Sequence, residues 1–106
     1  MTTSVGASHI LLMYAGSSRS SATRSKEEAA AEIAAILKEL QEGGDFAALA
    51  GKHSDCPSGK SGGDLGTFGR GNMVKAFEDS AFGMDVGGMS DIVETDFGFH
   101  IIKRTS

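Results

Sequence analysis

The chain has 106 residues, of which 40% are hydrophobic and 23% charged, and its net charge at pH 7 is −4. This length suits one domain with a single hydrophobic core, and the acidic balance argues against nucleic-acid binding, because neutralising phosphates needs a basic surface. No apolar run approaches a membrane span, and residues 1–9 lack the features of a signal peptide. A lone cysteine, Cys56, suits a reducing compartment. We therefore expect one cytoplasmic domain, residues 1–106.

The predicted elements begin with a strand at residues 7–14, whose residues are almost all apolar and so indicate a central strand. Residues 15–24 are serine-rich and aperiodic, which predicts an exposed loop. Ser25 and Glu28 have the spacing of a capping box and mark the start of a helix that ends at the glycine pair 43–44. The apolar stripe of this helix consists of Ile33, Ile36, Leu37 and Leu40.

A second, shorter helix is predicted from the cap residue Asp45 to about residue 52, with Phe46, Leu49 and Ala50 turned inward. The glycine-rich stretch 54–77 follows, and a long stretch of this kind with its own hydrophobic residues tends to be functional. The remaining predicted elements are a strand, a helix and a two-stranded hairpin, at residues 64–69, 74–82, 90–95 and 99–104. This order predicts an α+β fold with a small, mainly antiparallel sheet.

Two histidines, His9 and His100, lie in the first and last predicted strands. The first and last strands of small sheets often pair at the centre, which would make the two imidazoles hydrogen-bond partners. Alternatively, each is a packed polar residue bonded to backbone. Cys56 also has two interpretations, a thiol hydrolase in which imidazole generates the thiolate, or a buried structural cysteine. The cysteine and histidines lack the paired spacing of a zinc site, so we expect no metal.

Two further groups of residues could bind a ligand. An apolar pocket could be lined by Leu65, Met73 and Phe77, although an ordinary core is the simpler interpretation. A single anion could be held by Arg19, Arg24 and Lys26, a group too small to bind a duplex.

Five segments are similar to one known family: SHILL at residues 8–12, GGDFAALA at 43–50, SDC at 54–56, GGDLGTFGRGNMVKAFEDSAF at 62–82 and DIVETDFGFHIIKR at 91–104. In their order and spacing, over nearly the whole chain, they resemble a parvulin-type peptidyl-prolyl cis/trans isomerase. The SDC segment and the serine-containing loop are similar to the branch directed at phosphorylated Ser/Thr-Pro. The chain has no tryptophan, so the resemblance is to the catalytic domain without the WW domain of some members.

The resemblance implies a parvulin-like (FKBP-like) α+β fold, with a four-stranded antiparallel sheet surrounded by about four helices and a shallow groove for a peptide. It implies an isomerase that rotates X-Pro bonds by non-covalent stabilisation of the twisted amide, without a cofactor. The expected partners are proline-containing peptides and proteins, with a preference for acidic or phosphorylated residues before proline as a hypothesis. We expect a monomer that binds neither nucleic acid nor membranes. A non-catalytic proline-peptide binding or chaperone module is the alternative function.

The resemblance also assigns roles to residues. The implied catalytic set is His9, Cys56, Thr95 and His100. The implied proline-binding set is Leu65, Phe68, Met73 and Phe77. The residues implied in binding phosphate or an acidic side chain are Arg19 and Arg24. The chain departs from the phospho-directed branch where Met13 and Ser18 stand at positions that are basic in relatives.

Overall fold

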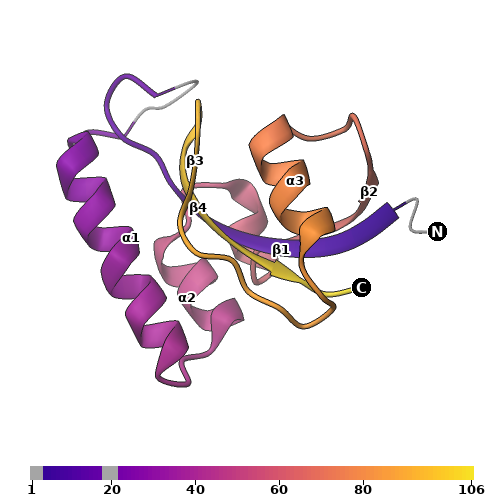
Figure 1. The fold of residues 1–106 in the computed structure, drawn as a ribbon. Helices are drawn as coiled ribbons and strands as arrows, with labels where there is room; N and C mark the ends of the chain where they lie inside the picture. The colour runs from indigo at the N-terminus through magenta and orange to yellow at the C-terminus, as the bar shows by residue number, and fades with distance from the viewer. Residues whose placement is uncertain (1–3, 18–21) are drawn as a thin grey trace.

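The protein is described by a computed structural model covering residues 4–17 and 22–106, shown in Figure 1. Its elements are β1 (Ser4–Leu12), α1 (Lys26–Gln41), α2 (Phe46–His53), the 3₁₀ helix η1 (Pro57–Ser61), β2 (Asp64–Gly69), α3 (Lys75–Gly83), β3 (Val93–Thr95) and β4 (Gly98–Arg104). The strands form one sheet in the order β2-β1-β4-β3, and every neighbouring pair is antiparallel. The predicted α+β fold with a four-stranded antiparallel sheet is confirmed. Within the described residues, the helices around the sheet are three α-helices and η1.

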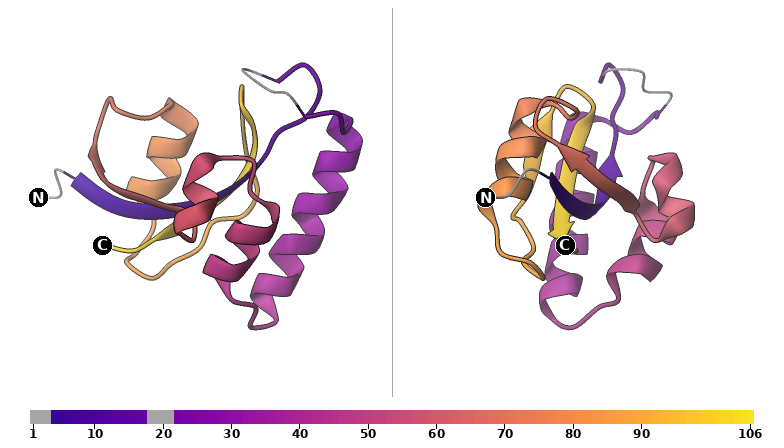
Figure 2. Two further views of the ribbon diagram at one scale, coloured as in Figure 1. Left: turned by 180° about the vertical axis from the view of Figure 1, so that it is seen from behind. Right: turned by 90° about the vertical axis from the view of Figure 1, so that its right-hand side faces the viewer.

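The sheet separates two hydrophobic clusters, because successive side chains of a strand point to opposite faces. Ile10 and Leu12 of β1 pack with α1 and α2 in one cluster. Val5 and Ala7 of the same strand pack with Phe77 of α3 in the other cluster. Figure 2 shows α3 on one side of the sheet and α2 on the other. The face that carries α3 is the one on which the site lies.

The first and last strands pair at the centre of the sheet, as predicted. In their register His9 lies opposite Ile102 and Leu11 lies opposite His100, so the two histidines are diagonal neighbours on adjacent strands. Odd-numbered residues of β1 and even-numbered residues of β4 share the α3 face. The strand pairing therefore brings together two histidines that are far apart in the chain.

The capping signals in the sequence agree with the structure at α1 and differ from it at α2. The Ser25 hydroxyl accepts a hydrogen bond from Glu28 N at 3.1 Å, and the Glu28 carboxylate accepts one from Ser25 N at 2.8 Å, so the predicted capping box is confirmed. Asp45 occupies the N-cap position of α2, but its side chain makes no capping hydrogen bond in the described structure. The second helix therefore begins without the bond that the sequence suggested.

Three predicted segments differ from the structure. The strand expected over residues 7–14 instead spans Ser4–Leu12. The strand expected over residues 90–95 is reduced to Val93–Thr95, with an isolated bridge between Met89 and Lys103. The reason lies in Ser90, whose hydroxyl oxygen, in place of a backbone carbonyl, accepts a hydrogen bond from Ile102 N at 2.9 Å. The glycine-rich stretch contains the unpredicted helix η1, which starts at Pro57 as expected for a residue with a fixed φ.

Candidate active site

The centre of the site is a chain of three polar side chains on the α3 face of the sheet. Nδ1 of His9 lies 3.1 Å from Nδ1 of His100, and Nε2 of His100 lies 2.7 Å from the Thr95 hydroxyl. The imidazole rings stack with centroids 5.3 Å apart. The Thr95 hydroxyl also accepts a hydrogen bond from Phe97 N at 3.2 Å, which ties it to the β3–β4 turn. The interpretation in which the histidines bond to each other is thus confirmed over separate bonding to backbone.

Both histidines are held in the neutral form. His9 is 5% exposed and His100 4% exposed, and a buried imidazole loses the hydration that stabilises its cation. Burial lowers the pKa of His9 from 6.5 to about 4. Burial also lowers the pKa of His100 to about 3, with a further contribution from the charge on His9. Two neutral rings share one hydrogen between their Nδ1 atoms, so one ring donates and the other accepts.

Phe77 of α3 lies directly against the histidine pair. Its ring is edge-on to His9 and to His100, each at a centroid distance of 5.5 Å. Phe68 of β2 contacts Phe77 at 5.9 Å, and both phenylalanines are buried. Leu65 and Met73 pack on the same cluster but remain partly exposed. The structure thus gathers all four residues of the predicted proline-binding set beside the histidines, with two buried and two at the edge.

Gly63 lets the chain approach the strand that carries His9. His9 N donates a hydrogen bond to Gly63 O at 2.9 Å. Gly63 has a φ of +86°, and a Cβ at this position would lie 2.4 Å from His9 O. A side chain here would push the glycine-rich stretch away from β1, so glycine is required by both space and conformation.

Cys56 lies next to the end of β1, at the start of the glycine-rich stretch. Asp55 N donates to Leu11 O at 2.7 Å, and Leu11 N donates to the Ser54 hydroxyl at 3.1 Å. The Cys56 side chain is half-buried as a free thiol, and the Ser58 hydroxyl donates to its sulfur at 3.1 Å. The thiol borders an open hollow of about 310 Å³ between α2 and η1. Among the described residues, no group of three or more His, Cys, Asp and Glu side chains could hold a metal ion.

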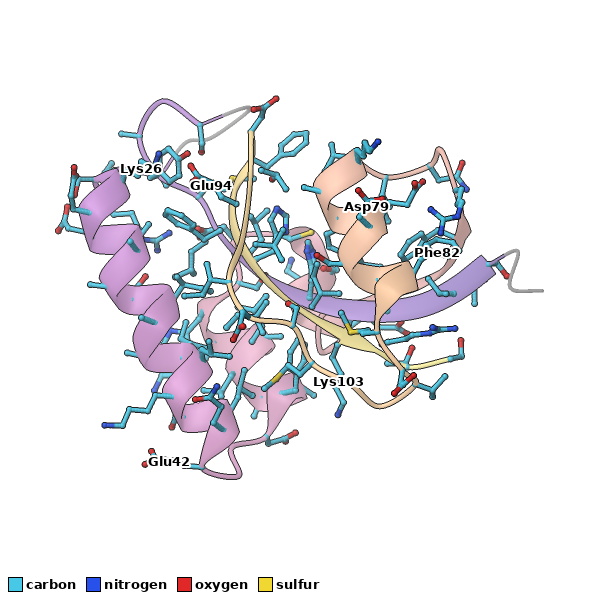
Figure 3. The ribbon with its side chains drawn as sticks, in the orientation of Figure 1. Lys26, Glu42, Asp79, Phe82, Glu94 and Lys103 are labelled. Carbon is cyan, nitrogen blue, oxygen red and sulfur yellow. The ribbon has the colours of Figure 1, made fainter. Side chains whose placement is uncertain are left out.

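The basic residues near the site are paired with carboxylates. Arg24 forms ion pairs with Asp55 and, at 3.2 Å, with Glu32. Lys26 lies 2.8 Å from the Glu94 carboxylate, and Figure 3 shows these two side chains pointing toward each other. This pairing raises the pKa of Lys26 and lowers that of Glu94, in both cases chiefly through their shared hydrogen bond. Arg19, the other predicted anion-binding residue, lies outside the described residues.

The sequence alone suggested no role for Asp55 or Glu94. Asp55 directly precedes Cys56, and Glu94 directly precedes Thr95, so each carboxylate lies one residue from a predicted catalytic residue. The available signal was an acid beside each site residue together with two basic residues, Arg24 and Lys26, which we had interpreted only as ligands of an anion. Only the folded chain shows which base meets which acid.

The family of this chain follows from comparison with known proteins. The chain matches the family model described as PPIC-type PPIASE domain over residues 1–106. It belongs to the PPIC-type peptidyl-prolyl cis/trans isomerases. It is 45% identical over 112 residues to peptidyl-prolyl cis-trans isomerase Pin1 of Digitalis lanata, covering 95% of each chain. It is also 45% identical to the isomerase ESS1 of Saccharomyces cerevisiae, covering 91% of this chain and 62% of that protein.

Solved structures show the same fold. The structure of peptidyl-prolyl isomerase ESS1 from Candida albicans superposes with a TM-score of 0.95 at 34% sequence identity, over 98% of this chain. The chain spans 63% of that protein's length. The parvulin resemblance and the isomerase activity implied by it are therefore confirmed, in preference to a non-catalytic module or a thiol hydrolase.

No helix in the described part of the chain is long and apolar enough to cross a membrane.

Proposed function

We propose that this isomerase lowers the barrier to X-Pro rotation without forming a covalent bond, by binding the twisted amide better than the planar one. The uncatalysed barrier is about 18–20 kcal/mol, and rotation takes tens of seconds or more. Reaching tens of milliseconds requires about 4 kcal/mol of transition-state stabilisation, at about 1.4 kcal/mol per tenfold. A modest apolar surface can supply this amount without a cofactor.

The observation that carries the proposal is the contact of Phe77 with both neutral imidazoles, at 5.5 Å each. A twisted amide has lost its resonance and is less polar than a planar one, so it favours an uncharged, weakly polar site. Leu65 and Met73, partly exposed at the edge of the same cluster, would receive the proline ring. The histidines contribute polarity without charge, because burial holds both of them neutral.

In this mechanism Cys56 is a polar neighbour of the reacting carbonyl, and its thiol does not act as a nucleophile. The histidine and threonine chain fixes the surroundings of the carbonyl by holding His9, His100 and Thr95 in one hydrogen-bonded arrangement. Isomerisation leaves all covalent bonds of the substrate intact, so a nucleophile is unnecessary. Trapping an intermediate attached to Cys56 during turnover would contradict the proposal.

The test is cis/trans exchange in a short Ala-Pro peptide, measured by NMR exchange spectroscopy. Met73→Ala and Leu65→Ala should lower the exchange rate at saturating enzyme by about tenfold each, the rate equivalent of about 1.4 kcal/mol of lost apolar contact. Val86→Ala is the matched control, because Val86 is 62% exposed on the loop after α3 and packs in neither cluster. If Met73→Ala and Leu65→Ala exchanged the peptide as fast as Val86→Ala, the proline ring would not bind at Leu65 and Met73.

We also propose that the enzyme prefers an acidic or phosphorylated residue before proline, and that Arg19 and not Arg24 provides this preference. Of the two arginines predicted to bind such a residue, Arg24 is paired with two carboxylates and Arg19 lies outside the described residues. Matched peptides with Ser, phospho-Ser or Glu before Pro test this directly, with Arg19→Ala as the variant. Faster exchange of the phospho-Ser or Glu peptide that Arg19→Ala abolishes is expected, and equal rates for all three peptides, unaffected by Arg19→Ala, would contradict the proposal.

The enzyme is further proposed to act as a monomer in the cytoplasm. A free Cys56 thiol supports a reducing compartment, where such thiols persist. Light scattering of the purified protein tests the monomer, and imaging of the tagged protein in its own cells tests the compartment.

A further inference from the structure

The residue before Cys56 is held by the end of the central strand. Asp55 N donates to Leu11 O at 2.7 Å, and the Asp55 carboxylate accepts a hydrogen bond from Met13 N at 2.9 Å. Asp55 is thus bonded to Leu11 through its backbone and to Met13 through its side chain. These bonds fix the direction in which the chain enters Cys56.

Arg24 connects this point to the start of α1. Its Nη1 bonds both to the Asp55 carboxylate and, at 2.9 Å, to Met13 O, and its Nε lies 3.2 Å from Glu32 on α1. Arg24 O also accepts a hydrogen bond from Ala15 N at 2.8 Å, so the two ends of the loop meet here. The Arg24 and Asp55 side chains are 27% and 28% exposed, so water screens this ion pair only in part. A guanidinium has five donors in a fixed plane and suits such a junction, whereas an ammonium group does not.

Binding a substrate anion would require Arg24 to give up these bonds. An anion at Nη1 competes with the Asp55 carboxylate and with Met13 O, and an anion at Nε competes with Glu32. The polar hollow beside the junction, about 360 Å³ and lined by Arg24, Asp55, Met13 and neighbouring loop residues, already contains the negative charge that neutralises Arg24. If Arg24 bound a substrate anion, it would therefore lose the contacts that hold Asp55. If Arg24 positions Asp55, all of these contacts are kept.

We propose that Arg24 is a positioning residue that acts through Asp55 to place the Cys56 thiol, and that it does not bind the acidic or phosphorylated residue of the substrate. This inference rests on the role proposed for Cys56 in turnover. Arg24 holds Asp55, Asp55 orients the residue that follows it, and the serine-rich loop is anchored at the same junction. Removing the guanidinium affects every proline substrate alike, because the effect is exerted on the enzyme and not on a particular side chain of the peptide.

The experiment compares Arg24→Gln, Asp55→Asn and the double variant on peptides with Ala, Glu or phospho-Ser before Pro. Arg24→Gln is expected to lower kcat/KM by about fivefold for all three peptides, as loss of a partly buried charge-assisted bond does. The double variant is expected to be no worse than the more impaired single variant, because both remove the same junction. Lys38→Gln is the matched control, since Lys38 is an exposed cation in the last turn of α1 and its loss changes the net charge equally.

A second readout reports on Cys56 itself. Since the chain has one cysteine, the rate of alkylation by iodoacetamide measures the exposure and ionisation of this thiol alone. Arg24→Gln and Asp55→Asn are expected to change this rate by about threefold or more in the same direction, while thermal unfolding shows that the variants remain folded. Arg24→Lys should resemble Arg24→Gln, because lysine keeps the charge and loses the fork of donors.

Other outcomes would overturn the inference. A loss confined to the Glu and phospho-Ser peptides, with rescue by Arg24→Lys, would make Arg24 an anion ligand. Unchanged alkylation and unchanged exchange in the folded variants would leave Arg24 with no effect on the site. If Arg24→Gln fails to fold, Asp55→Asn and Arg24→Lys decide the question by the same two readouts. Full activity of Cys56→Ala would instead refute the role proposed for Cys56, and alkylation of Arg24→Gln would still report whether Arg24 positions the thiol.

Discussion

Acidification should destabilise this protein through the buried histidine pair. The pKa of His9 in the folded protein is about 4 and that of His100 about 3, below the ordinary value of 6.5 that each regains on unfolding. Between these values the unfolded chain binds protons that the folded chain excludes, so stability must fall as the pH falls. The loss begins near pH 6.5 and ends once the folded protein itself becomes protonated.

The size of the effect follows from these pKa values. At pH 5 an unfolded histidine is almost fully protonated, whereas both folded imidazoles are still mostly neutral. Each histidine then lowers the free energy of unfolding by about 2 kcal/mol relative to pH 8, so the pair accounts for about 4 kcal/mol. This is a large share of the stability of an ordinary small domain, and most carboxylates are still ionised at this pH.

The assay is urea unfolding at pH 8 and pH 5, followed by circular dichroism. The double variant His9→Leu/His100→Leu replaces both partners of the hydrogen bond with apolar side chains, so its stability at pH 8 should be close to that of the wild type. It should lose about 4 kcal/mol less than the wild type between the two pH values. His53→Gln, which changes the histidine at the end of α2, should leave the wild-type loss in place. Equal losses in wild type and double variant would refute the reasoning.

Three further predictions concern stability. Gly63→Ala should cost about 2 kcal/mol or more in urea unfolding, because alanine is strained at a φ of +86° and its Cβ would meet His9 O; unchanged stability would show that β1 can move away from this turn. Thr95→Val leaves His100 Nε2 and Phe97 N without their shared partner, so it should cost about 1–3 kcal/mol and shift the ¹⁵N resonances of His100, and unmoved resonances would contradict the hydrogen bond. Ser25→Ala removes the cap of α1 and should cost about 1 kcal/mol, seen as a lower Tm, with Ser25→Asp as the variant expected to restore it.

The local elements were largely predictable because each depends on a short stretch of sequence. The capping box at Ser25, the strand Asp64–Gly69 and the helix around Phe77 are encoded by neighbouring residues, and the structure confirms each of them. One error arose where a distant residue intervened. Ser90 lies outside β3 because its hydroxyl accepts the hydrogen bond of Ile102 N, and no pattern within residues 90–95 indicates this.

The sequence alone determined the order of the strands and α-helices, the apolar faces and the two histidines in strands, because periodicity and capping act over a few residues. The family resemblance also placed the proline-binding residues in one stretch. Only the tertiary structure decided which charged side chains around the site form ion pairs with each other. In the folded chain Arg24 pairs with Asp55, and Lys26 pairs with Glu94. Arg24, a candidate phosphate ligand from the sequence, is therefore proposed as a positioning residue. The physical reason is that an ion pair depends on which charges the fold brings within a few ångströms, and residues separated by 31 and 68 positions carry no local sign of their partner.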